Sequence, residues 1–512
     1  MRLLLFSSLS LFLLVQFNHT ESKEDKVILC YFSSWATYRW SNGKFDVENI
    51  DPFICTHVAY GFAGLDPNSY KIRLLDPYND LEENWGKGAM KRFNDLKKKN
   101  PKLVTLLSVG GWNEGATSYS KMVSTRARRK IFIESTMELL KKHGFDGLDF
   151  DWEYPGGRAD SPGSPTDRKN YVKLLQELRK ALDTAGGLKL TAAVSAGENT
   201  INKAYNIPAM GKYMDLINVM TYDYHGWWPG HTFTGHNSPL YGLPEEETNI
   251  THPGYHFNSN YSMNYYVQNG APKEKLLMGF GAYGRGFQLA DPNENGFYAK
   301  ATNGISAGKY TATIGYWGFN EYCELMQTEN SQWTLVRDPR VVAPYIYKGN
   351  QWFSFDDIQS IKIKSEYILE QGFRGGFVWS IDSDDFLGLC GEGKFPLLTT
   401  MNNVLNGGIP TPEPTPEPTT RDPSMPTDTT TPSEPSSGTS EEPNTFRPTS
   451  IDPGVCTSAG LSSDPKDCNK YYMCIPNVEG GFDSLHQRCD PNLVYNPEAK
   501  YCDWLENVPM CS

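Results

Sequence analysis

Between residues 27 and 405, short apolar runs alternate with longer stretches in which apolar residues recur at helical spacing. Helical patterns cover residues 126–143 and 167–184, among others. Eight strands with intervening helices predict an α/β fold, a closed parallel TIM (β/α)8 barrel, with an open doubly wound sheet as the alternative. The strand-like runs begin near Val27, Thr56, Leu103, Phe145, Leu188, Met214, Leu276 and Gly375.

Two segments depart from this rhythm. Residues from about 288 to 353 are rich in Gly, Tyr and Trp and form too long a stretch for a plain loop. Residues 408–453 are the predicted linker, since the part from Pro410 to Pro453 holds 12 Pro, 11 Thr and 6 Ser and cannot bury a core. We expect this linker to be extended and to carry O-linked sugar. It separates a large domain, residues 22–407, from a cysteine-rich module, residues 454–512.

The first 21 residues have the pattern of a secretory signal peptide, because Arg2 precedes an apolar run from Leu3 to Phe17. A signal anchor is the alternative. No later segment is apolar for the roughly 18 residues that a membrane span needs, so we expect a secreted, extracellular protein without a membrane partner. Half of the formal net charge of −12 lies in the linker, so the folded parts are only mildly acidic and nothing predicts a nucleic-acid partner.

The most informative run is Asp146-Gly-Leu-Asp-Phe-Asp-Trp-Glu-Tyr-Pro155. Asp149, Asp151 and Glu153 occupy every second position, so in a strand they share one face. Crowded carboxyls raise one another's pKa, and one of them can keep a proton near neutral pH and act as a general acid. Three solvated acids on an exposed strand are the alternative, but Phe150 and Trp152 between them leave neither face plainly polar.

The pattern D-x-x-D-x-D-x-E from Asp146 to Glu153 resembles the signature of glycoside hydrolase family 18, the chitinases and their relatives. The resemblance implies a barrel whose residues 288–353 form a small α+β insertion between the seventh and eighth strands. It implies that Glu153 is the acid/base, that Asp151 orients the substrate's N-acetyl group, that Asp149 shares a proton with Asp151, and that Tyr222 hydrogen-bonds the acetamide carbonyl. It implies no cofactor and no metal.

Aromatic and polar residues recur at the predicted strand ends, where barrel enzymes place their sites. A single Trp is more often part of a core than a sugar platform, but tryptophans converging from the first, third and eighth strands favour platforms. By the same resemblance the predicted substrate-binding residues are Tyr31, Trp35, Phe62, Gly111, Trp112, Tyr154, Met220, Asp223, Trp228, Tyr283, Arg285 and Trp379.

The implied reaction is hydrolysis of β-1,4 bonds between N-acetylglucosamine units by a secreted endochitinase. Family 18 is an exception to the two-carboxylate scheme, because the substrate's acetamide is the nucleophile and the anomeric configuration is retained. Inactive relatives act as chitin lectins or matrix proteins and usually lack the acid at the position of Glu153, which is present here. An endo-N-acetylglucosaminidase is the other alternative. We expect chitin and its oligosaccharides as partners, and a monomer.

Weaker signals have ordinary interpretations. Gly279 to Gly284 match G-x-G-x-x-G, but no helical pattern follows, so the match predicts no dinucleotide site. The loop histidines His225, His231 and His236 fit no metal-ligand spacing. Asn249 and Asn260 begin N-glycosylation sequons in a predicted surface loop.

The ten cysteines fall into a group of four in the large domain and a group of six in the module. Even numbers and export predict disulfides, with zinc ligation by the six as the alternative. We expect Cys30–Cys55 and Cys323–Cys390. The last six resemble a peritrophin-A type chitin-binding domain, which implies Cys456–Cys474, Cys468–Cys511 and Cys489–Cys502, with Tyr472, Tyr495 and Trp504 as sugar contacts. Core packing of Tyr472 and Tyr495 is the alternative. The whole layout resembles arthropod chitinases, including mite allergens.

Overall fold

The computed structural model describes residues 25–228, 230–329, 332–408, 460–476, 482–489, 493–497, 501–504 and 508. The predicted signal peptide and nearly all of the predicted linker lie outside these residues. The chain divides into two compact units, residues 1–415 and 416–512, and each is considered by itself. No helix among the described residues is long and apolar enough to cross a membrane.

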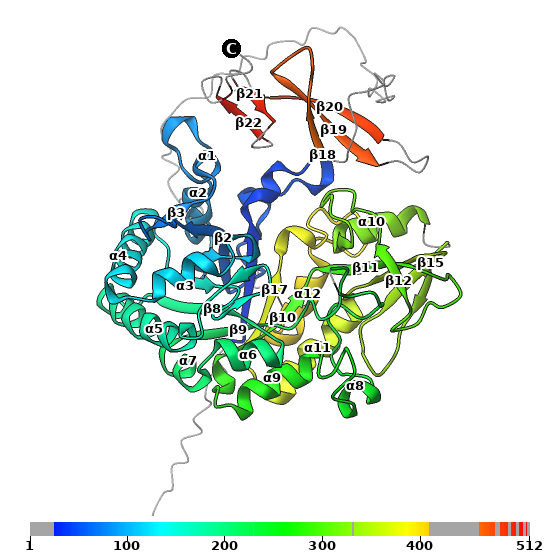
Figure 1. Cartoon of the computed structure of the whole chain (residues 1–512), viewed down its shortest axis with the longest axis horizontal. Helices are drawn as coiled ribbons and strands as arrows, with labels where there is room; N and C mark the ends of the chain where they lie inside the picture. The colour runs from blue at the N-terminus through cyan, green and yellow to red at the C-terminus, as the bar shows by residue number, and fades with distance from the viewer. Residues whose placement is uncertain are drawn as a thin grey trace, which may run out of the picture. The chain divides into compact units, whose positions relative to one another are not determined.

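Eight parallel strands close into a barrel in the first unit (Figure 1). Closure is direct, because the first strand pairs with both the second and the last. The predicted strand starts lie within about two residues of the observed ones. The barrel strands, in chain order, are β1 Val27–Ser33, β2 His57–Leu65, β4 Val104–Gly110, β5 Gly147–Asp151, β8 Lys189–Ser195, β9 Leu216–Met220, β10 Leu276–Gly281 and β17 Gly375–Trp379.

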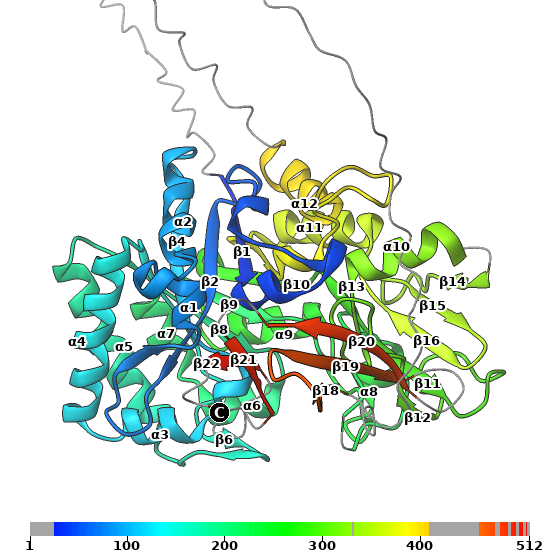
Figure 2. The ribbon, with the colours of Figure 1, turned by 90° about the horizontal axis from the view of Figure 1, so that it is seen from above.

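Helices surround this barrel, and the two predicted from periodicity are observed as α4 Arg126–His143 and α5 Asp167–Thr184. Figure 2 shows α11 and α12 side by side on one flank, and the two helices pack against each other. The other helices of this unit, apart from the insertion, are α1 Pro77–Asp80, α2 Ala89–Asp95, α3 Thr117–Val123, α6 Glu198–Ala204, α7 Ile207–Tyr213, α8 Pro244–Thr248, α9 Ser259–Gln268, α11 Ile358–Gln371 and α12 Pro396–Asn406.

The insertion between β10 and β17 is an antiparallel sheet with one helix, as the resemblance implied. It begins earlier than predicted, because its central strand starts at Tyr283 and continues almost directly from β10. Figure 1 shows it on the side of the barrel opposite α4. Its elements are β11 Tyr283–Leu289, β12 Ala301–Gly304, β13 Tyr316–Gly318, α10 Phe319–Glu329, β14 Thr334–Val336, β15 Tyr345–Lys348 and β16 Gln351–Ser354.

Strand alternation divides the core into two layers. Along β1, Cys30 and Phe32 belong to the cluster packed beneath the helices, whereas Leu29 and Tyr31 belong to the cluster inside the barrel. The disulfide Cys30–Cys55 ties β1 to the loop before β2, and Cys323–Cys390 ties α10 to the loop after β17. Both predicted pairings in this unit are therefore confirmed.

The second unit is built from short antiparallel strands. β18 Gly460–Ser463, β19 Lys470–Pro476 and β20 Phe482–Arg488 form one sheet, and β21 Leu493–Asn496 and β22 Tyr501–Trp504 form a hairpin. Cys468 and Cys489 are both disulfide-bonded. The pairings predicted here involve side chains outside the described residues. A unit of this size buries too little apolar surface to be stable by itself, so it depends on disulfides.

Candidate active site

The alternation of β5 sets the direction of the carboxylates. Leu148, Phe150 and Trp152 belong to the cluster beneath the helices, and the Phe150 ring lies 5.8 Å from that of Tyr171 in α5. The residues between them take the opposite face, so Asp149 and Asp151 point into the barrel. Glu153 lies two residues beyond the end of the strand and is 8% exposed. The structure therefore brings the three predicted acids together, buried rather than solvated.

Asp149 is held by four neighbours inside the barrel. Its oxygens accept hydrogen bonds from Tyr31 Oη (2.8 Å), Ser108 Oγ (2.7 Å), Thr191 Oγ1 (2.6 Å) and Asn218 Nδ2 (3.1 Å). Burial raises the pKa of Asp149, and several of these hydrogen bonds oppose that shift. Tyr31, predicted at the barrel mouth, thus lies deeper and anchors this carboxyl.

Asp151 lacks such support. Its Oδ1 atom is buried and has no hydrogen-bond partner among the described residues. Burial raises the pKa of Asp151 well above its usual range, and the charges of Glu153 and Asp149 raise it further. A buried carboxyl oxygen without a donor is costly unless a ligand supplies one. Asp151 is therefore suited to receive a polar hydrogen from a bound molecule.

Burial also raises the pKa of Glu153, to about 7. A hydrogen bond from Tyr154 and the charge of Arg158 lower it, and the charge of Asp223 raises it. From sequence, crowding among the three acids was the expected cause. The structure assigns the larger part to loss of hydration, because Glu153 is enclosed by the barrel mouth. A carboxyl with a pKa near neutrality can donate a proton and take it back.

The loop after β9 carries the next group of predicted residues. Tyr222 is 9% exposed. Asp223 Oδ1 accepts a hydrogen bond from Arg285 Nε at 2.7 Å, and the guanidinium carbon of Arg285 lies 5.5 Å from the Trp228 ring centroid. Met220 ends β9 beside the inner cluster. These side chains form one wall of the site.

Buried polar groups fix this loop from behind. Asn237 Oδ1 accepts a hydrogen bond from the Asp223 backbone N–H at 3.1 Å. Ser238 Oγ donates a hydrogen bond to the Thr221 carbonyl at 2.6 Å and accepts one from Lys364 Nζ at 3.0 Å. Lys364, fully buried in α11, also donates to Asp356 Oδ2 at 2.7 Å. Sequence reasoning did not find this ion pair, although its partners lie only eight residues apart in the chain.

An aromatic stack lines the opposite wall, at the ends of β1, β2 and β17. The Phe62 ring lies 6.0 Å from Trp35 and 5.7 Å from Trp379, nearly parallel to both. Gly111 has φ +86°, and a Cβ there would lie 2.8 Å from the Phe62 ring, so only glycine fits at this position. Rings exposed at one face suit the apolar faces of sugars. Non-proline cis peptide bonds follow Gly61, Glu153 and Trp379 at these strand ends.

Two further predicted residues complete the rim and the floor. Trp112 is 55% exposed, and Arg158 lies over its ring at 3.5 Å while donating to the Glu153 carbonyl. Tyr283 is buried, and its hydroxyl has no partner among the described residues. Arg158 was not predicted from sequence, although it lies only five residues beyond Glu153.

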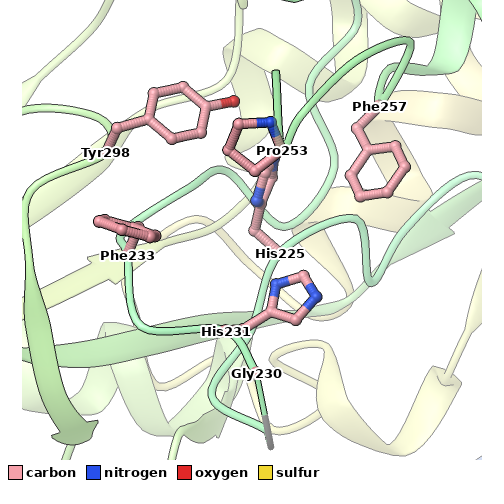
Figure 3. A pocket seen from close by; sticks show the side chains of 7 residues that line it. All are labelled: His225, Gly230, His231, Phe233, Pro253, Phe257 and Tyr298. Carbon is pink, nitrogen blue, oxygen red and sulfur yellow. The ribbon is translucent and has the colours of Figure 1, made fainter. Parts of the chain in front are cut away.

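The loop histidines do not converge as ligands. His225 and His231 line a cavity of about 140 Å³ with Phe233, Pro253, Phe257 and Tyr298 (Figure 3). His236 lies elsewhere, hydrogen-bonded to the Pro344 carbonyl. Among the described residues, the one group with convergent ligand atoms is Cys323, Cys390 and Asp385, and its cysteines form a disulfide. Gly279 to Gly284 lie in β10 and β11, with no helix following.

Two of the outlying predictions need adjustment. Asn249 is exposed, but Asn260 lies in the first turn of α9 rather than in a loop, and its side-chain oxygen accepts from Tyr367 Oη at 2.8 Å. In the second unit Tyr495 is 2% exposed and stacks on Tyr471, so its ring serves the core instead of a sugar. Tyr472 is half-buried, and the Trp504 side chain lies outside the described residues.

Two family profiles match the chain. Glycosyl hydrolases family 18 matches residues 27–384, and the chitin binding Peritrophin-A domain matches residues 456–511. The chain is 33% identical to an endochitinase of Manduca sexta, over 94% of each chain.

Solved structures agree with the profiles. A Group IV chitinase of Ostrinia furnacalis is 44% identical with a TM-score of 0.71, covering 74% of this chain and 100% of that one. Human YKL-39, described as a pseudo-chitinase that retains chitooligosaccharide binding, is 34% identical with a TM-score of 0.67, covering 74% of this chain and 99% of that one.

Proposed function

This chain belongs to glycosyl hydrolase family 18 and carries a peritrophin-A chitin-binding domain, and we propose that it is a secreted endochitinase with a retaining, substrate-assisted mechanism. Its relatives include proteins named endochitinase and chitinase, which supports hydrolysis of chitin. The observation that carries the mechanism is the contrast between Asp149, saturated with hydrogen bonds, and Asp151, whose Oδ1 atom has no donor among the described residues.

In the first step, Glu153 gives its proton to the glycosidic oxygen. The carbonyl oxygen of the substrate's acetamide attacks the anomeric carbon, the bond to the leaving sugar breaks, and an oxazolinium ion forms. Asp151 accepts the acetamide N–H and stabilises the positive charge that develops there. The Tyr222 hydroxyl donates to the acetamide carbonyl and holds it in line.

In the second step, the Glu153 carboxylate removes a proton from water, and the resulting hydroxide attacks the anomeric carbon from the side of the departed sugar. The oxazolinium ring opens and the acetamide is restored. Two inversions at one carbon leave the configuration retained. Trp35, Phe62 and Trp379 hold the sugars on one wall, and Asp223 with Arg285 binds hydroxyls on the other.

Turnover of a fluorogenic chitobioside separates this proposal from a chitin lectin. Wild type should hydrolyse it, and Glu153→Gln should lose about 10²–10⁴-fold in kcat, because the general acid is gone. Binding of a chitin oligomer, measured by calorimetry on both proteins, is the control and should persist. Binding without turnover by the wild type would instead assign the function suggested by the likeness to the pseudo-chitinase.

A further inference from the structure

A buried ion pair joins the two chain segments that carry Trp35 and Trp379, two rings of the aromatic stack. Trp35 lies in the 3-10 helix η1, Ser34–Tyr38, and Arg39 follows that helix directly. Trp379 ends β17, and Asp382 lies three residues beyond it. Arg39 Nη1 lies 2.7 Å from Asp382 Oδ2, and the two side chains are 14% and 0% exposed. The pair therefore links η1 to the loop after β17.

Asp382 also receives hydrogen bonds from two other elements. It is the central residue of the 3-10 helix η9, Ile381–Ser383. Its Oδ1 atom accepts a hydrogen bond from the Ser33 backbone N–H, at the end of β1, at 3.1 Å. Its carbonyl oxygen accepts hydrogen bonds from Arg39 Nη1 at 3.3 Å and from Asn320 Nδ2, in the first turn of α10, at 3.4 Å. One residue thus holds β1, the end of η1 and the insertion together.

The charge of Asp382 depends on Arg39. The Asp382 Oδ2 atom makes no hydrogen bond among the described residues, so the nearby guanidinium compensates it by charge and not through an aligned hydrogen bond. Removing the guanidinium would leave a fully buried carboxylate without a cationic partner. Hydrogen bonds depend on direction and distance, whereas the burial of apolar rings is non-directional. These polar contacts therefore fix η1 against η9 more closely than the rings do.

The two tryptophans differ in how they are held. The Trp379 ring lies 5.6 Å from that of Tyr31, so the interior of the barrel supports it. Trp35 is 44% exposed, and its ring lies 6.1 Å from that of Trp379 with the planes 41° apart. The spacing of these rings consequently depends on how η1 is held, and a sugar that contacts both rings is sensitive to that spacing.

We propose that Arg39 and Asp382 are positioning residues, which set the distance between Trp35 and Trp379 and thereby the fit of sugars on this wall of the site. This inference rests on the proposed function. Asp382 is fully buried and its charge is taken up by Arg39, so the pair acts through the two rings and not on the reacting atoms. A buried ion pair adds little stability compared with apolar packing, and its contribution here is geometry.

The test measures sugar binding in a Glu153→Gln background of the full chain, where turnover plays no part. Arg39→Met should weaken binding of the tetramer of N-acetylglucosamine about tenfold in calorimetry, because the rings lose their spacing. Arg39→Lys keeps the charge and should recover most of the affinity. Arg129→Met is the matched control, since Arg129 is another buried arginine, 5% exposed and paired with Glu177 between α4 and α5. It should leave the affinity unchanged.

An affinity of Arg39→Met equal to that of the background protein would overturn the proposal, and so would an equal loss in Arg129→Met. Because the assay needs no turnover, a wild type without chitinase activity would refute the proposed function while this measurement still decided the role of Arg39.

A double variant separates geometry from stability. Asp382→Asn removes the buried charge and keeps an oxygen to accept the Ser33 N–H. Arg39→Met combined with Asp382→Asn should therefore be more stable in urea titrations than Arg39→Met alone, while its affinity for the tetramer stays about tenfold below that of the background protein. Recovery of both stability and affinity would show that the pair serves stability alone and would overturn the proposal.

Discussion

Asp149, Asp151 and Glu153 are at most 8% exposed, whereas Trp35 and Trp112, at the rim of the same site, are 44% and 55% exposed. The buried acids owe their raised pKa values chiefly to lost hydration, and their neighbours are fixed by hydrogen bonds that cross the barrel. Exclusion of bulk water lets a buried carboxyl keep its proton and strengthens its electrostatic effect, while a sugar platform must stay open until a sugar covers it.

The largest expected effect lies within the buried row. Asp151→Asn should reduce kcat on a chitotrioside about 10²–10³-fold although Glu153 remains, because the charge that stabilises the oxazolinium ion is removed. Steady-state kinetics with the purified variant measure this. Activity close to wild type would show that Asp151 only fills space.

The support behind the loop after β9 gives the next effect. Lys364→Met leaves Asp356 as an unpaired buried charge, which should cost about 3–5 kcal/mol in the free energy of unfolding. Lys364→Met combined with Asp356→Leu should recover most of that stability in urea titrations. If the double variant also recovered full kcat, the pair would matter for stability alone and would not position Tyr222 and Asp223.

The pH dependence tests the buried row without mutation. Because Glu153 must be protonated to act as an acid, kcat/KM should fall about tenfold per pH unit above a pKa of about 7. The folded state binds this proton more tightly than the unfolded chain. Glu153 therefore contributes stability that is complete below about 4.5 and lost as the pH rises through about 7, and Glu153→Gln should flatten that part of the stability profile. A kcat/KM that stays level to pH 9 would contradict this assignment.

The smallest expected effect is on the binding side. Deleting residues 454–512 should lower the rate on solid chitin by about tenfold or less and spare soluble oligomers, because tethering raises the local concentration of enzyme at the surface. Equal losses on both substrates would refute the tether.

Local patterns predicted much of the fold. Apolar periodicity located the barrel strands and the bounds of α4 and α5, because each is decided by neighbours a few residues away. Alternation along β5 correctly placed Asp149 and Asp151 on one face. The contacts that tune them were not predictable, because Tyr31 and Thr191 reach Asp149 from strands 118 and 42 residues away. Burial of Tyr495 likewise depends on packing that no local pattern contains.

The central claim is that the substrate supplies its own nucleophile, and a series of aryl chitobiosides tests it directly. The N-acetyl group next to the cleaved bond is replaced by mono-, di- and trifluoroacetyl groups, which weaken the acetamide oxygen as a nucleophile while changing its size little. We predict that kcat/KM falls steeply with each fluorine. A rate independent of fluorination would contradict the account and would assign the attack to a carboxylate of the enzyme.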